Sequence, residues 1–174
     1  SLCTRYECVA LDDIDSGCQL SDEMRSLLGR VGVNSISAPV DITNYLMLDS
    51  GQPLHAFDLD KIIEVSPTGR PDIIVRAASK GETLELLDGR TIALSPADIV
   101  VAVGDAASSV PIALAGAMGG MATEITPQTR RVLLESATFD LYHLRGTQFR
   151  HGIFSEAITR FTKGQPAQLT HPVL

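Results

Sequence analysis

The sequence predicts a single α+β domain with an antiparallel, β-barrel-like core that is flanked by helices. Apolar residues recur at helical spacing near both ends of the chain, and short β-branched runs fill the middle. An Asp-Gly dipeptide at 88–89 separates two of those runs. This dipeptide supplies the positive φ angles of a tight hairpin, so neighbouring strands are expected to be antiparallel. Residues 1–174 are enough for one domain with a buried core.

The N-terminal part is expected to form a strand over residues 2–10 and then a helix. Ser21 is the expected N-cap of that helix, because two acidic residues follow it and favour the positive end of the helix dipole. Apolar residues then repeat every three or four positions, and Gly32 is expected to close the helix.

A second helix is expected to begin near Asp41 and to end at Gly51. The next segment, 52–57, contains Pro53, which fixes its own φ angle and restricts the residue before it. We expect a rigid loop here that carries His55.

The second half is expected to contain short strands and then two more helices. A helix is predicted after Asp140, and Ser155 is the expected N-cap of a last short helix that ends at Phe161. The tail from 165 to 174 is expected to be loose. Six strands with the spacing of an antiparallel sheet or barrel are predicted, at 73–77, 83–87, 91–94, 99–103, 110–115 and 131–137.

Composition limits the partners and the compartment. The net charge is −7, whereas a domain that grips a polynucleotide through its phosphates should be basic. No apolar run reaches the roughly 20 residues of a membrane helix. Three cysteines without metal-type spacing suit a reducing compartment, with the thiols as small core residues, so we expect a cytoplasmic protein. The chain opens on Ser1 without a methionine, and we interpret it as a domain excised from a longer protein, with removal of the methionine or another processed terminus as alternatives.

Three features could carry chemistry, and each has a plain alternative. The glycine-containing segment 115–120 could let a backbone approach a ligand, or could be a tight turn. Glu135, in an otherwise apolar strand, could be a specificity group or could simply face solvent. His55 could be a positioned imidazole or an ordinary loop histidine. The other histidines show no ligand spacing, so no metal site is expected, and His151 is expected to be structural.

Four blocks together resemble, in the same order, the editing domain of the beta subunit of bacterial phenylalanyl-tRNA synthetases. They are Thr43-Asn44-Tyr45 with Gly51-Gln52-Pro53-Leu54-His55-Ala56-Phe57-Asp58, then Leu114-Ala115-Gly116-Ala117-Met118-Gly119-Gly120, Val132-Leu133-Leu134-Glu135-Ser136-Ala137 and Arg150-His151-Gly152. The resemblance covers nearly the whole chain. The chain departs from the family at Thr162-Lys163, where a Glu-Arg pair is usual, which puts contacts of that end with neighbouring domains in doubt.

The resemblance implies a site. His55 and Asn44 would lie beside a hydrolytic water and the terminal adenosine, and Glu135 would accept a hydrogen bond from a tyrosine hydroxyl. Whether His55 is a base or only a hydrogen-bond partner stays open. No Ser-His-Asp type of nucleophile is evident in the sequence. Further pocket positions implied by the resemblance are Thr43, Pro53, Ala115, Gly116, Gly119, Ser155 and Ala157.

The implied reaction is the hydrolysis of tyrosine from misacylated phenylalanine tRNA by a positioned water. The implied partners are the aminoacylated 3′ end of that tRNA, the synthetase alpha subunit and other beta-subunit domains. No cofactor is expected in this domain, and ATP and Mg²⁺ would act only in the parent synthetase. Two alternatives stay open: a non-catalytic module of the same synthetase for tRNA binding or subunit assembly, and an unrelated small-ligand enzyme that uses the glycine loop.

Overall fold

The computed structural model describes all residues from Ser1 to Leu174 and contains six α-helices, two short 3-10 helices and nine strands. The helices are α1 (Asp22–Arg30), α2 (Ala38–Ser50), α3 (Leu59–Val65), α4 (Leu141–His151), α5 (Glu156–Phe161) and α6 (Thr170–Val173). The strands are β1 (Cys3–Leu11), β2 (Leu54–Asp58), β3 (Ile73–Ala77), β4 (Thr83–Glu85), β5 (Thr91–Ala93), β6 (Ile99–Gly104), β7 (Ser109–Leu114), β8 (Met118–Gly119) and β9 (Val132–Phe139).

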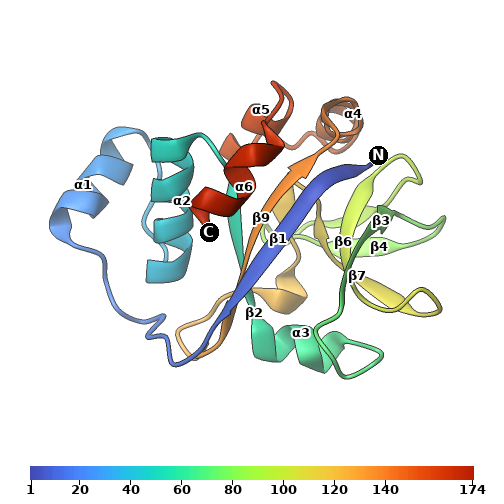
Figure 1. The fold of residues 1–174 in the computed structure, drawn as a ribbon, viewed down its shortest axis with the longest axis horizontal. Coiled ribbons are helices and arrows are strands. Elements are labelled where there is room, and N and C mark those ends of the chain that lie inside the picture. Colours follow the sequence, from blue (N-terminus) through green and yellow to red (C-terminus); the bar gives the residue numbers. More distant parts are fainter.

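The strands form three antiparallel sheets, with the orders β1-β9-β2, β3-β6-β7-β8 and β4-β5. In Figure 1 the long strands β1 and β9 cross the middle of the molecule, with α1 and α2 on one side and the four-stranded sheet on the other. The predicted α+β class and the antiparallel pairing are confirmed. The sheets do not join into a closed barrel, because β1 and β2 end one sheet while β3 and β8 end another.

One hydrophobic core fills the space between the sheets. It joins Phe57 and Leu133 of the three-stranded sheet to Ile112 and Leu114 of the four-stranded sheet. Residues of α4 and α5 complete the same cluster. Strand β6 is buried along its whole length, which explains why its sequence is continuously apolar rather than alternating.

The predicted helix boundaries are close to those of the structure. The Ser21 hydroxyl accepts a hydrogen bond from the Met24 amide at the start of α1, as expected of an N-cap. Helix α2 begins earlier than predicted, at Ala38, since proline near the first turn is compatible with a helix start. It ends at Ser50, and the predicted terminator Gly51 caps it with a φ angle of 81°.

Three sequence expectations were wrong. Residues 54–58 form strand β2 instead of a loop, because their backbone pairs with β9. The tail is ordered, since α6 packs against β1 and β9 and Thr170 is fully buried. Two of the three free cysteines, Cys8 and Cys18, are exposed and do not fill the core, whereas Cys3 is partly buried and packs against it. Helix α3 was not among the predicted elements.

Candidate functional site

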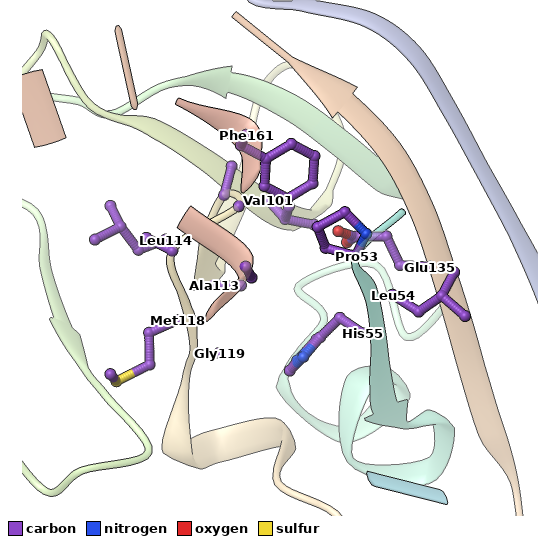
Figure 2. Close-up of a pocket in the computed structure, with 14 residues that line it drawn as sticks. Pro53, Leu54, His55, Val101, Ala113, Leu114, Met118, Gly119, Glu135 and Phe161 are labelled. Atoms are coloured by element: carbon purple, nitrogen blue, oxygen red, sulfur yellow. The ribbon is translucent and has the colours of Figure 1, made fainter. Parts of the chain in front are cut away.

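Strand pairing brings the two principal candidate residues together. In the register of β2 and β9, His55 lies directly opposite Glu135. Residues opposite each other on neighbouring strands have side chains on the same face of the sheet. Both side chains accordingly line one cavity, opposite the segment that contains Gly119, as Figure 2 shows.

Gln52 holds the start of β2 in place, although the sequence did not single it out. Its side chain is fully buried, and Nε2 donates hydrogen bonds to the carbonyl oxygens of Ala137 (2.9 Å) and Pro53 (3.2 Å). These bonds tie the segment before β2 to β9. The sequence signal that could have indicated this role is a polar residue between a helix-ending glycine and a proline.

Glu135 is a buried carboxylate with one hydrogen bond. It is 6% exposed, and its Oε2 accepts from the Tyr6 hydroxyl at 2.8 Å. Burial raises the pKa of Glu135 to about 7, while the hydrogen bond from Tyr6 acts in the opposite direction. Near neutral pH this side chain therefore exists in both protonation states, at the wall of a cavity.

His55 is half-buried and has an apolar neighbourhood. Its ring packs edge-on against Phe57, with the ring centroids 4.3 Å apart and an interplanar angle of 82°. Burial lowers the pKa of His55 to about 4, so the imidazole is neutral at physiological pH. A neutral imidazole has one donor nitrogen and one acceptor nitrogen.

The glycine segment is both a turn and a close approach. The Ala117 amide donates to the Leu114 carbonyl (3.0 Å), which closes a turn, and Gly116 has a φ angle of 63°. At Gly119 a Cβ atom would lie 2.7 Å from both Cε1 and Nε2 of His55. A side chain at 119 would therefore push the imidazole out of its position.

Two adjoining cavities share His55. The first has an empty volume of about 410 Å³ and lies between β2, β9, the 113–119 segment and Phe161. The second is a larger cleft of about 1090 Å³ that extends to α2, to residues 120–125 and to the start of α5. Six residues line both: Leu54, His55, Ala117, Met118, Gly119 and Ala157.

All ten residues predicted for the site line one or both cavities. The smaller cavity contains Pro53, Ala115, Gly116 and Glu135, the larger cleft contains Thr43, Asn44 and Ser155, and His55, Gly119 and Ala157 belong to both. Their roles toward a ligand stay predictions. Leu54, Met118 and Phe161 were not predicted, because an apolar wall residue resembles any core residue in sequence.

The polar residues of the larger cleft differ in how much of their hydrogen-bonding capacity the fold uses. Thr43 donates to the Val40 carbonyl (2.7 Å) within α2. Ser155 donates to the Ala117 carbonyl (2.9 Å) and caps α5 by accepting from the Ile158 amide (3.2 Å). The Asn44 amide has no such partner within the chain, so its donor and acceptor groups remain available.

The Arg150-His151-Gly152 block has a structural position away from the cavities. Asp98 is 1% exposed and accepts hydrogen bonds from His151 Nε2, Thr147 Oγ1 and the Ser95 amide, each at 2.8 Å. It also pairs with the Arg150 guanidinium. Burial by itself raises the pKa of Asp98, but the bonds from His151, Ser95 and Thr147 outweigh it and hold the pKa below its usual value. The structural interpretation of His151 agrees with this geometry.

The remaining titratable groups do not assemble into a second site. His143 pairs with Asp140, and His171 pairs with Glu7, all at the surface or near it. No three side chains among His, Cys, Asp and Glu converge closely enough to hold a metal ion. None of the helices has the length and apolar character needed to cross a bilayer.

The chain matches one known protein family along almost its whole length. Residues 2–174 match the family model described as the B3/4 domain. This chain belongs to the B3/4 domain family. The match covers almost the whole chain, so both cavities and all ten candidate residues lie inside the B3/4 domain.

Similar curated proteins are phenylalanine–tRNA ligase beta subunits. The chain is 42% identical over 172 residues to the one from Anaeromyxobacter dehalogenans, covering 99% of this chain and 20% of that protein. It is 44% identical over 168 residues to the one from Dehalococcoides mccartyi strain CBDB1, covering 97% of this chain and 19% of that protein. This B3/4 domain thus spans about a fifth of the length of these relatives.

A solved structure has the same fold. It is an N-terminal fragment of the phenylalanyl-tRNA synthetase beta subunit from Pyrococcus horikoshii, with a TM-score of 0.51 and 13% identity. The similarity covers 90% of this chain and 46% of that one. At this identity the likeness concerns the arrangement of the B3/4 backbone alone.

Proposed function

We propose that this B3/4 domain is part of a phenylalanine–tRNA ligase beta subunit and removes tyrosine from wrongly charged phenylalanine tRNA. The identity to beta subunits over nearly the full chain supports the first part. The observation that carries the second part is the buried Glu135 carboxylate at the wall of a largely apolar cavity, directly across from His55. Such a wall offers apolar contacts to an aromatic ring and a hydrogen-bond acceptor to a hydroxyl group at its end.

The two cavities suggest where each part of an aminoacylated 3′ end would bind. The amino-acid side chain would enter the smaller cavity toward Glu135, and the terminal adenosine would occupy the larger cleft beside Asn44 and Thr43. The ester bond would then lie at the residues that line both, near His55 and Gly119. Pro53, Ala115, Gly116, Ser155 and Ala157 would contact the ligand from the walls.

Selectivity for tyrosine follows from the cost of covering a buried carboxylate oxygen that has no hydrogen-bond partner. The Glu135 carboxylate would accept a charge-assisted hydrogen bond from a tyrosine hydroxyl, worth about 1.5–3 kcal/mol. A phenylalanine ring would cover the same carboxylate without giving it a partner, which is unfavourable in an apolar site. A site that requires the hydroxyl rejects the analogue that lacks it more strongly than an apolar pocket can reject an added hydroxyl.

Hydrolysis would use a bound water. The water oxygen attacks the ester carbonyl carbon, the bond between that carbon and the ribose oxygen breaks, and the water proton passes to the ribose oxygen. The products are free tyrosine and uncharged tRNA. Neutral His55 could accept the proton or orient the water, and Asn44 could hold the substrate, so that positioning lowers the barrier of this reactive ester. No step requires a cofactor from this domain, and ATP and Mg²⁺ would serve aminoacylation elsewhere in the synthetase.

The partners would share the work of binding. With a net charge of −7, this domain is a poor binder of a phosphate backbone, so the affinity for tRNA would come from other beta-subunit domains and the alpha subunit. The domain itself would receive only the 3′ end, in the cytoplasm.

The test measures deacylation of tyrosyl- and phenylalanyl-tRNA(Phe) by the 174-residue chain and by the parent synthetase. Selective release of tyrosine is expected, Glu135→Ala should lose the selectivity, and His55→Ala should slow release. Asp49→Asn, an exposed change on α2, serves as the control and should behave as wild type. Wild-type behaviour of both site variants in the parent would contradict the proposal. Absence of release by wild type would favour a non-catalytic tRNA-binding or assembly module.

A further inference from the structure

Tyr6 lies behind the candidate specificity residue rather than in the cavity. In the antiparallel register of β1 and β9, Cys8 is opposite Glu135 and Tyr6 is opposite Ala137, so Tyr6 reaches Glu135 diagonally. Its hydroxyl donates to Glu135 Oε2 at 2.8 Å. Tyr6 does not line either cavity, whereas Glu135 lines the smaller one. Glu135 thus receives Tyr6 from β1 on one side and faces His55 of β2 on the other.

We propose that Tyr6 is a positioning residue for specificity, whose hydroxyl binds one carboxylate oxygen of Glu135 and leaves the other for a phenolic ligand. The inference rests on the proposed function, and it names a residue that would act through Glu135 without touching the ligand. An ionised carboxylate only accepts hydrogen bonds, and its two oxygens offer several acceptor positions. Two phenols, one internal and one from the ligand, can therefore bind the same carboxylate. Oε1 makes no hydrogen bond within the chain and is the oxygen that stays free.

Tyr6 is suited to this role because it keeps its proton. Burial and the neighbouring Glu135 charge raise the pKa of Tyr6 well above its usual value, so the hydroxyl stays a donor at every working pH. A donor that cannot ionise holds the carboxylate in one orientation.

The other titratable groups that face Glu135 do not replace Tyr6. From β1, partial loss of solvent and, after it, the Glu135 charge raise the pKa values of the Cys3 and Cys8 thiols, so both stay neutral near pH 7. From β2, burial keeps His55 neutral above about pH 4. No cation faces Glu135, and Tyr6 is the one group in the chain that stabilises its ionised form. Removal of the Tyr6 hydroxyl should therefore raise the pKa of Glu135 further and leave it protonated at neutral pH.

The test is Tyr6→Phe, which keeps the ring in the sheet and removes only the hydroxyl. At pH 7 the rate of tyrosyl-tRNA(Phe) deacylation should fall roughly tenfold, the loss expected for one hydrogen bond to a charged group. The rate should recover toward wild type as the pH rises to 8.5, after subtraction of spontaneous hydrolysis, because Glu135 ionises again. Phenylalanyl-tRNA(Phe) deacylation should not fall, because a protonated Glu135 presents no charge for the phenylalanine ring to cover. Tyr142→Phe, at an exposed tyrosine of α4, is the matched control and should show neither effect.

A second measurement follows Glu135 directly. Titration of the side-chain carboxyl carbon by ¹³C NMR in the 174-residue chain should give a higher pKa in Tyr6→Phe than in wild type. In a Glu135→Gln background, Tyr6→Phe should no longer alter the pH profile. A role in packing alone would lower activity equally at all pH values.

The outcomes separate this inference from the proposed function. Suppose that Glu135→Gln loses tyrosine selectivity, while Tyr6→Phe changes neither the pH profile nor the pKa of Glu135. This result would overturn the role of Tyr6 and leave the proposed function intact. If wild type does not prefer the tyrosyl ester, the proposed function fails, and the ligand role of Tyr6 fails with it.

Discussion

Asp98 and Glu135 are both buried carboxylates, but they have opposite environments. Asp98 accepts hydrogen bonds from the Ser95 amide, Thr147 and His151 and pairs with Arg150. Its pKa is lowered. Glu135 accepts from Tyr6 alone, borders a cavity, and has a pKa raised to about 7. A buried acid whose hydrogen-bonding capacity is satisfied is typical of a structural role, as at Asp98, whereas a buried acid with a free oxygen at a cavity wall is typical of a functional site. This difference supports the ligand role that we propose for Glu135.

The largest effect is expected at Asp98. Asp98→Ala would leave Arg150, His151 and Thr147 without their shared acceptor, and the free energy of unfolding should fall by about 3 kcal/mol. Chemical denaturation measures it, with Asp49→Ala as a control near zero, since Asp49 is exposed. Folded Asp98→Ala should keep wild-type selectivity for tyrosyl-tRNA. Loss of selectivity at unchanged stability would contradict the structural role of Asp98.

Glu135→Gln should have a different, pH-dependent effect on stability. The folded-state pKa of about 7 lies above the ordinary 4.5, so the stabilising contribution of protonated Glu135 is complete below pH 4.5 and is lost as the pH rises through 7. The unfolding free energy of Glu135→Gln relative to wild type should therefore increase between pH 4.5 and 8, by at most about 3 kcal/mol. Glu64→Gln, at an exposed position on α3, should give a flat difference. A flat difference for Glu135→Gln would mean that its pKa is not raised.

A smaller loss of stability is expected at Gly119. The Cβ of Gly119→Ala would overlap the His55 ring, which should move at a cost of about 1–2 kcal/mol and slow deacylation of tyrosyl-tRNA. Gly29→Ala, on an exposed and unobstructed part of α1, is the control and should stabilise by about 0.5–1 kcal/mol. Full activity of Gly119→Ala would show that the position of His55 does not matter.

Much of the fold could be predicted because local signals agree with the final packing. The caps at Ser21 and Ser155 and the end of α2 at Gly51 each follow from a side chain or backbone preference within a few residues. The strand nature of 54–58 could not be predicted in this way, because it depends on pairing with β9, some eighty residues later. Barrel closure likewise depends on edges that meet only in three dimensions.

The site residues likewise differ in whether the sequence could reveal them. The ten candidate residues came from a family resemblance, and the structure places all of them around two adjoining cavities. Tyr6 and Gln52 escaped notice because their importance lies in contacts with distant partners, Glu135 and Ala137. A tyrosine in a strand resembles any half-buried aromatic residue until its hydroxyl is seen to meet a carboxylate.

The most direct test of the central claim observes the Glu135 carboxyl by ¹³C NMR while non-hydrolysable tyrosyl and phenylalanyl amides of 3′-amino-adenosine are added. The tyrosyl compound should lower the pKa of Glu135, because its hydroxyl donates to the ionised form, and the phenylalanyl compound should not. Equal shifts with both compounds, or no shift with either, would contradict the assignment of Glu135 as the acceptor for the tyrosine hydroxyl.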